Sequence, residues 1–83
     1  MNTEQRVVGI LEDLSGNTDI KESDRLFEEL ALDSLNMVTL LLIIEDEFNI
    51  ALNESDMNPF DMKTVADVIT LVNKYTGTKN EKS

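Results

Sequence analysis

The sequence contains no cysteine and no histidine. Without cysteine the chain can form neither a disulfide nor a thiolate metal site, and it has no thiol of its own. Without histidine it lacks the side chain that most often acts as a base near neutral pH. A serine nucleophile needs such a base to take its proton, and no carboxylate or lysine in the sequence is marked for that role. We therefore expect no autonomous enzyme and no catalytic residue.

Long apolar runs are also absent. The longest, from Leu40 to Ile44, is too short to span a bilayer, and no charged-then-apolar leader opens the chain. The sequence therefore predicts a soluble cytoplasmic protein without membrane insertion.

Basic residues are missing from the middle of the chain, where no lysine or arginine occurs between Leu26 and Met62. The formal net charge is −10. Such a field repels nucleic acid and attracts basic protein surfaces, although acidity also simply keeps a small domain in solution. The acids lack the spacing of a calcium loop, and three consecutive acids fan around a helix, so we expect no metal site. The acids of the middle segment are Glu28, Glu29, Asp33, Glu45, Asp46, Glu47, Glu54, Asp56 and Asp61.

What the chain does have is helical periodicity. With 83 residues, one proline and three glycines, it fits a single small domain over residues 1–77 with a polar tail over 78–83. Its apolar spacing and polar caps predict a first helix over residues 4–15, a central one over 34–49, a brief third one after Asn53 and a last one from Thr64 to Gly77. The predicted third helix is interrupted at Asn58-Pro59. A long loop over residues 18–31 precedes the central helix, pinned by apolar residues.

Two apolar stripes run along the central helix. Leu35, Val38 and Leu42 share one helical row with Glu45, and Val38, Leu41, Ile44 and Phe48 form a second row. A helix that is apolar on two stripes either lies at the centre of a bundle or keeps apolar surface for a partner. We expect this helix to do both.

The chain resembles the acyl carrier protein and peptidyl carrier protein family over residues 4 to 76. The resemblance implies an all-α fold, a small four-helix bundle with a long first loop and a short third helix. The residues that carry it are Leu32-Asp33-Ser34-Leu35, Val38-Thr39-Leu40, Glu45-Asp46-Glu47-Phe48-Asn49-Ile50 and Thr64-Val65-Ala66-Asp67-Val68-Ile69.

The resemblance also implies a function. In that family the serine of Asp-Ser-Leu receives 4′-phosphopantetheine from coenzyme A through a separate phosphopantetheinyl transferase, and the thiol of the arm holds acyl or aminoacyl groups as thioesters. Ser34 occupies that position. A chain without cysteine needs such a borrowed thiol, and the start of a helix suits the phosphodiester. For Asp33-Ser34-Leu35 alone, simple helix capping is the alternative.

Partner contacts are implied as well. Asp33, Glu45 and Asp46 match acidic positions that family partners read with basic residues, and Leu35 and Leu42 match apolar positions beside the serine. Core packing is the alternative for both leucines. We expect a monomer that meets the transferase, an acyl- or aminoacyl-loading enzyme and downstream biosynthetic enzymes through their basic surfaces.

The sequence departs from fatty-acid carriers in places. Asn36, Val38 and Thr39 stand where those carriers commonly have acids, and the segment from Asn53 to Met62 is about two residues longer than usual. We therefore expect a stand-alone carrier for a dedicated biosynthetic pathway. An aminoacyl or peptidyl carrier loaded by an adenylating enzyme is the alternative in the same class, and an unmodified acidic helical adaptor is the alternative from another class.

Overall fold

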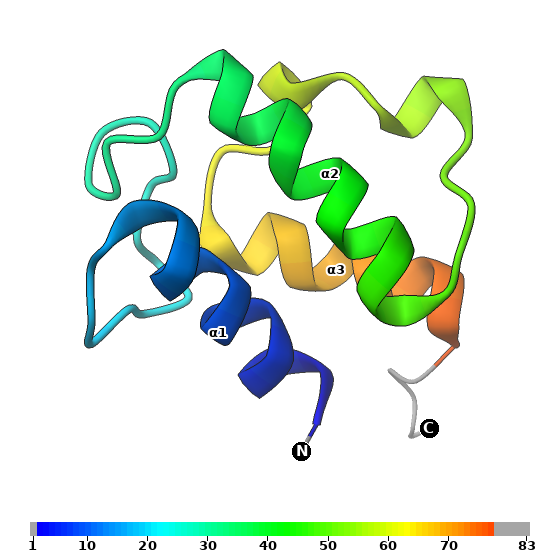
Figure 1. Ribbon diagram of the computed structural model, residues 1–83, viewed down its shortest axis with the longest axis horizontal. Coiled ribbons are helices and arrows are strands. Elements are labelled where there is room, and N and C mark those ends of the chain that lie inside the picture. The colour runs from blue at the N-terminus through cyan, green and yellow to red at the C-terminus, as the bar shows by residue number, and fades with distance from the viewer. Residues whose placement is uncertain (1, 78–83) are drawn as a thin grey trace.

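The computed structural model describes residues 2–77, so the predicted tail over 78–83 lies outside the described residues. Three α-helices, α1 (Thr3–Ser15), α2 (Ser34–Phe48) and α3 (Val65–Thr76), carry the fold (Figure 1). Two single turns of 3-10 helix, η1 (Glu54–Asp56) and η2 (Pro59–Asp61), lie between α2 and α3. The expected all-α fold is confirmed.

Each α-helix begins at a polar cap and ends at a left-handed residue. The side chains of Asn2, Asp33 and Thr64 each accept the backbone N–H of the residue three positions later. The side chain of that later residue in turn accepts the backbone N–H of the cap residue. Such reciprocal capping satisfies two amides that the first turn leaves without partners. Gly16, Asn49 and Gly77 end the helices at positive φ. The first helix thus begins one residue earlier than expected, because Asn2 caps it in place of Thr3.

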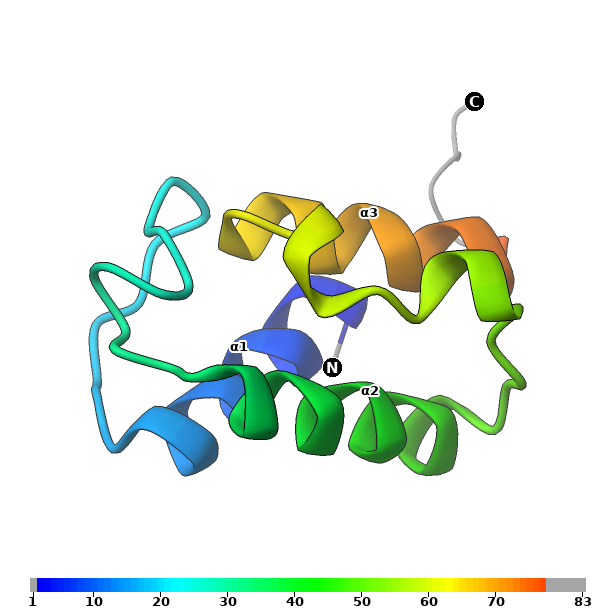
Figure 2. The ribbon, with the colours of Figure 1, turned by 90° about the horizontal axis from the view of Figure 1, so that it is seen from above.

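The core lies where α1 packs against both α2 and α3 (Figures 1 and 2). From α2 it takes Met37, Leu40, Leu41 and Ile44, and from α3 Val65, Val68, Leu71 and Val72. No polar or charged side chain is buried among the described residues. The interior of this part of the chain is therefore held by apolar packing, and all of its charged side chains lie at or near the surface.

The loop of residues 16–33 connects α1 to α2 (Figure 2) and is hydrogen-bonded to the end of the α2–α3 connection and to the start of α3. Its fully buried Leu26 donates its backbone N–H to the Lys63 carbonyl over 2.9 Å, and the Leu26 carbonyl accepts from Leu32 over 3.0 Å. The Asp24 carbonyl accepts from Val65 at the start of α3. These bonds fix the approach of the chain to Ser34. The loop is anchored by buried leucines, as its sequence predicts.

The predicted short third helix exists only as two separate 3-10 turns, so the four-helix description holds in part. Pro59 has no backbone N–H and disfavours helical geometry at Asn58, which is extended here and caps η2 through its side chain. The first turn, η1, has no side-chain cap at Asn53. A single continuous helix would need the donor that proline lacks.

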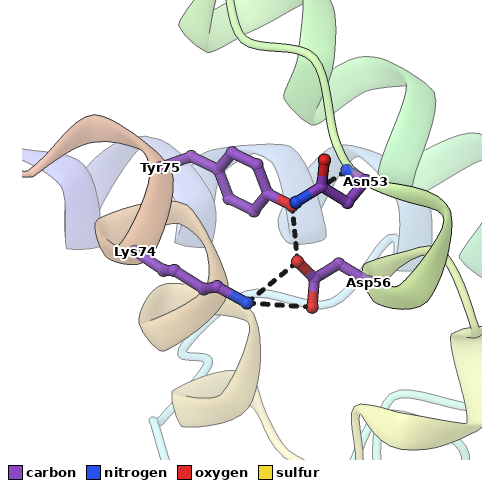
Figure 3. Close-up of polar contacts among 4 residues, drawn as sticks. All are labelled: Asn53, Asp56, Lys74 and Tyr75. Carbon is purple, nitrogen blue, oxygen red and sulfur yellow. Dashed lines mark hydrogen bonds and ion pairs between the residues drawn. The ribbon is translucent and has the colours of Figure 1, made fainter.

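Polar contacts hold η1 against α3 (Figure 3). The Tyr75 hydroxyl donates to the Asp56 carboxylate and accepts the Asn53 backbone N–H over 2.8 Å. The Lys74 ammonium lies 3.0 Å from the same carboxylate. The Tyr75 hydrogen bond and then the Lys74 ammonium hold the pKa of Asp56 below its usual value. We call these four residues the η1 clamp.

Candidate functional site

The candidate site is the exposed start of α2, where Ser34 is the first helical residue. Asp33, the cap before it, accepts the Asn36 N–H over 2.8 Å, and the Asn36 side chain accepts the Asp33 N–H over 3.2 Å. This capping box sets the first turn rigidly around the serine. Ser34 is therefore exposed at an ordered helix end. The residue that caps the helix is Asp33, not Ser34.

The first turn of α2 suits an anion bound to Ser34. Within residues 2–77, the backbone N–H groups of Ser34 and Leu35 have no protein acceptor, and no acid stands in the first helical turn. Free amides and the positive end of the helix dipole both favour a phosphate at such a position. Asp33 is the nearest negative charge in sequence, and its carboxylate is occupied in capping. The residues present thus fit a phosphodiester on the Ser34 oxygen.

An apolar row begins beside the serine and runs along α2. Leu35 is 72% exposed, Val38 43% and Leu42 54%, although all three are large apolar side chains. Core packing for Leu35 and Leu42 is therefore wrong, and the expected apolar surface is present. Exposed apolar side chains gathered on one helical row are typical of a contact surface. This row, Leu35, Val38 and Leu42, is called the α2 apolar row below.

The acids at the far end of α2 divide into two kinds. Glu45 is half-buried and accepts the Leu52 backbone N–H over 2.9 Å, and Glu47 pairs with Arg6 of α1 over 3.1 Å. Asp46 between them is exposed and has no side-chain partner in the part of the chain that the structure describes. Three acids were expected to meet partners. Asp46 is free to do so, whereas the carboxylate of Glu45 already holds the exit from α2 and that of Asp33 caps the start of α2.

One aromatic contact was not expected from the sequence. The rings of Phe27, from the first loop, and Phe60, from η2, stack with centroids 5.7 Å apart and an interplanar angle of 12°. The sequence predicts only that the first loop is pinned by apolar residues, and nothing in it indicates that residues of two separate connecting segments meet. Phe60 remains 63% exposed, so it does not serve as a core anchor.

Two other properties follow from the described residues. In residues 2–77 no three acidic side chains gather as metal ligands. No helix there is long and apolar enough to cross a membrane.

Comparison with known proteins identifies the family. The family model described as "Phosphopantetheine attachment site" matches residues 5–72. The acyl carrier protein of Chlamydia muridarum is 34% identical over 74 residues, which cover 87% of this chain and 94% of that protein. The D-alanyl carrier protein of Enterococcus faecalis is 40% identical over 60 residues, which cover 70% of this chain and 77% of that protein.

A solved structure gives the same result in three dimensions. It is described as "a putative acyl carrier protein" from Mycobacterium tuberculosis, and it superposes with a TM-score of 0.79 at 30% identity. The superposition covers 88% of this chain and 97% of that one. The chain belongs to the phosphopantetheine-attachment family of acyl carrier proteins, which are not enzymes but carry a covalent 4′-phosphopantetheine group and work with a phosphopantetheinyl transferase and with biosynthetic enzymes.

Proposed function

We propose that Ser34 is the residue that carries 4′-phosphopantetheine. The observation that carries this proposal is the exposed hydroxyl of Ser34 at a capped helix start inside the matched region, beside two backbone amides that have no protein acceptor. The other serines of the described chain do not open an α-helix, and Ser15 uses its hydroxyl as a donor to the Leu11 carbonyl. Among the serines that the structure describes, only Ser34 is exposed at the N-terminus of an α-helix.

The residues of this chain have three tasks toward the arm. The arm itself supplies the thiol, on which a cargo is held as a thioester. Asp33 fixes the first turn, the Ser34 and Leu35 amides offset the negative phosphodiester, and the exposed Ser34 oxygen leaves room for an enzyme to reach it. Because the chain contains no histidine, the base that activates the serine hydroxyl comes from the transferase.

Partners approach along α2 in this proposal. The α2 apolar row offers contact area next to Ser34, and Asp46 offers a free charge about one helical turn beyond Leu42, the last residue of the row. An exposed charge acts mainly on the rate of encounter, whereas apolar contact contributes to the lifetime of the complex. The proposal also includes a single domain over residues 1–77, a monomer and a cytoplasmic location, which the small size and high net charge of the chain support.

The cargo is an acyl group of a dedicated biosynthetic pathway. The neutral first half of α2, which sets this chain apart from the fatty-acid carriers it resembles, supports a partner set of its own. An aminoacyl cargo is the second candidate, and the D-alanyl carrier protein among the relatives favours it.

The attachment is tested by intact mass after incubation with coenzyme A, Mg²⁺ and a broad-specificity transferase. We expect one phosphopantetheine mass on the wild type and on Ser23→Ala, an exposed loop serine that serves as the control. Ser34→Ala should remain unmodified and equally helical. A modified Ser34→Ala protein, or a wild type that never gains the mass, would contradict the proposal. Loading the holo form with acyl adenylates beside aminoacyl adenylates then separates the two cargo classes.

A further inference from the structure

A hollow of about 380 Å³ lies between the first loop and the α2–α3 connection. Its lining comes from Arg25, Phe27 and Glu28 on one side and from Phe60 and Lys63 on the other. The hollow is open to solvent and falls within the size range of small-molecule pockets. Neither the capping of α2 nor the α2 apolar row accounts for it.

The floor of the hollow is aromatic. The nearly parallel rings of Phe27 and Phe60 are stacked on each other, yet Phe60 is 63% exposed. A phenyl face that is left open prefers a further ring in an offset stack or edge-on, because the ring quadrupoles then attract. The floor therefore suits a planar ring better than a flexible chain.

One polar group at the rim is free for a ligand. Arg25 is paired with Glu28 over 2.7 Å and with Glu29 over 3.2 Å. No carboxylate in residues 2–77 forms an ion pair with the Lys63 ammonium, although its backbone N–H donates to Asp67. In a chain with a net charge of −10, a lysine without a partner beside two phenyl rings suits a ring that carries an acceptor or an anionic substituent.

The hollow is close to the proposed attachment site. Ser34 is two residues beyond Leu32, which places their Cα atoms at most about 7 Å apart. The Leu32 N–H is bonded to the Leu26 carbonyl, and Leu26 precedes Phe27. The backbone of Phe27 is thus within about 15 Å of Ser34. Figure 2 shows the first loop leading directly into the start of α2. The second 3-10 turn, η2, which carries Phe60, is in contact with α2. A group tethered at Ser34 is therefore confined near the hollow, where its effective concentration is high.

We propose that this hollow holds the cargo of the arm, and that the cargo it selects is an aromatic acyl group. The inference rests on the proposed function, since it needs the arm on Ser34. The ring lies on Phe60, with its substituent toward Lys63. The cargo is then held in an open site between two loops, outside a core whose large side chains are fully buried. A straight alkyl chain gains little there, because it has no face to offer the rings.

The test uses the whole chain loaded by a broad-specificity transferase with amide-linked coenzyme A analogues that carry 4-hydroxyphenylacetyl, cyclohexylacetyl or hexanoyl groups. Intact mass first establishes that each arm is attached. Two-dimensional NMR then records the shifts of the Phe27, Phe60 and Lys63 signals against the unloaded holo form. We expect the aromatic arm to shift these signals at least threefold more than either saturated arm.

Matched variants separate the hollow from the rest of the surface. Phe60→Leu keeps an apolar side chain without the ring face and should reduce the shifts of the Phe27 and Lys63 signals to those caused by the saturated arms. Lys63→Met should reduce the shifts of the two phenylalanine signals in part. Lys21→Met, at an exposed lysine of the first loop that does not line the hollow, should leave them unchanged.

Equal shifts from all three arms would overturn the inference that the cargo is aromatic. Shifts confined to signals of α2 would overturn the inference that the hollow holds the cargo. Shifts that persist in Phe60→Leu also overturn it. If the mass spectrum shows no arm on the chain, the proposed function itself fails, and the inference fails with it. If the arm is attached but the signals do not move, only this inference is wrong.

Discussion

At the scale of single residues, the η1 clamp depends on one carboxylate, Asp56. The Tyr75 hydroxyl and the Lys74 ammonium both favour its charged form, so its pKa in the folded chain lies below the ordinary 3.8. A carboxylate whose pKa is lowered by folding stabilises the fold fully at pH values above its pKa in the unfolded chain. This contribution is lost as the pH falls through its pKa in the folded chain. We therefore expect Asp56→Asn to lower the Tm by a few degrees at pH 7 and the difference from wild type to shrink below about pH 4.

The control for this clamp prediction is Asp61→Asn, because Asp61 is exposed on η2 and has no side-chain partner in residues 2–77. It should leave the Tm at pH 7 unchanged. Thermal melts from pH 7 to pH 3 measure all three proteins. A difference between Asp56→Asn and wild type that stays constant over this range would show that the charge of Asp56 is not what stabilises the fold.

Glu45 and Asp46 are neighbours in sequence with opposite roles in the structure. Glu45→Lys removes the acceptor of the Leu52 N–H, and an unsatisfied backbone donor there costs about 1–3 kcal/mol. Asp46→Lys removes only an exposed charge, so it should leave the Tm unchanged but slow phosphopantetheinylation several-fold at low salt. The measurements are the Tm and the initial rate against salt.

Asp13→Lys makes the same charge change as Asp46→Lys at an exposed site on α1. If it slows the transferase as much as Asp46→Lys does, partners sense only the total charge and α2 is not their docking surface.

At the scale of elements, α2 depends on its capping box for the geometry around Ser34. Asp33→Ala leaves the Asn36 N–H without its acceptor and should destabilise the fold by about 1 kcal/mol, or roughly 4–8 °C in Tm. Asp33→Asn keeps an acceptor and should restore most of that loss. Thermal unfolding and circular dichroism compare the three proteins. Equal losses in Asp33→Ala and Asp33→Asn would mean that the negative charge, and not the cap, stabilises α2.

At the scale of the whole molecule, the chain carries a net charge of −10, and the part of it that the structure describes forms a body of 32 × 27 × 19 Å. At 0.01 M salt the Debye length of about 30 Å spans this body, so every pair of acids repels, whereas at 0.15 M it is about 8 Å and only neighbours do. The repulsion destabilises the compact state. We expect the Tm to rise by several degrees between these two conditions. A flat or falling Tm would show that the ion pairs already balance the repulsion.

The sequence alone was enough to predict the three α-helices and to single out the candidate serine, but not to predict that the third helix is two separate 3-10 turns. Capping boxes, apolar periodicity and glycine stops are local signals, because each acts within a few residues of chain. Asp33, Thr64, Gly16 and Gly77 accordingly mark helix ends in the structure as they do in the sequence. Ser34 could be singled out because its neighbours, and not distant contacts, define the motif.

Contacts between distant segments were decided only by the tertiary structure. Two apolar rows on α2 compete for one core, and packing against α1 and α3 buries Leu41 and Ile44 while the α2 apolar row stays outside. Equivalent acids receive different roles because the chain leaving α2 brings the Leu52 N–H to Glu45 and leaves Asp46 in solvent. Phe27 and Phe60 meet for the same reason: long-range packing sets two loops side by side, and no pattern within either loop encodes the other.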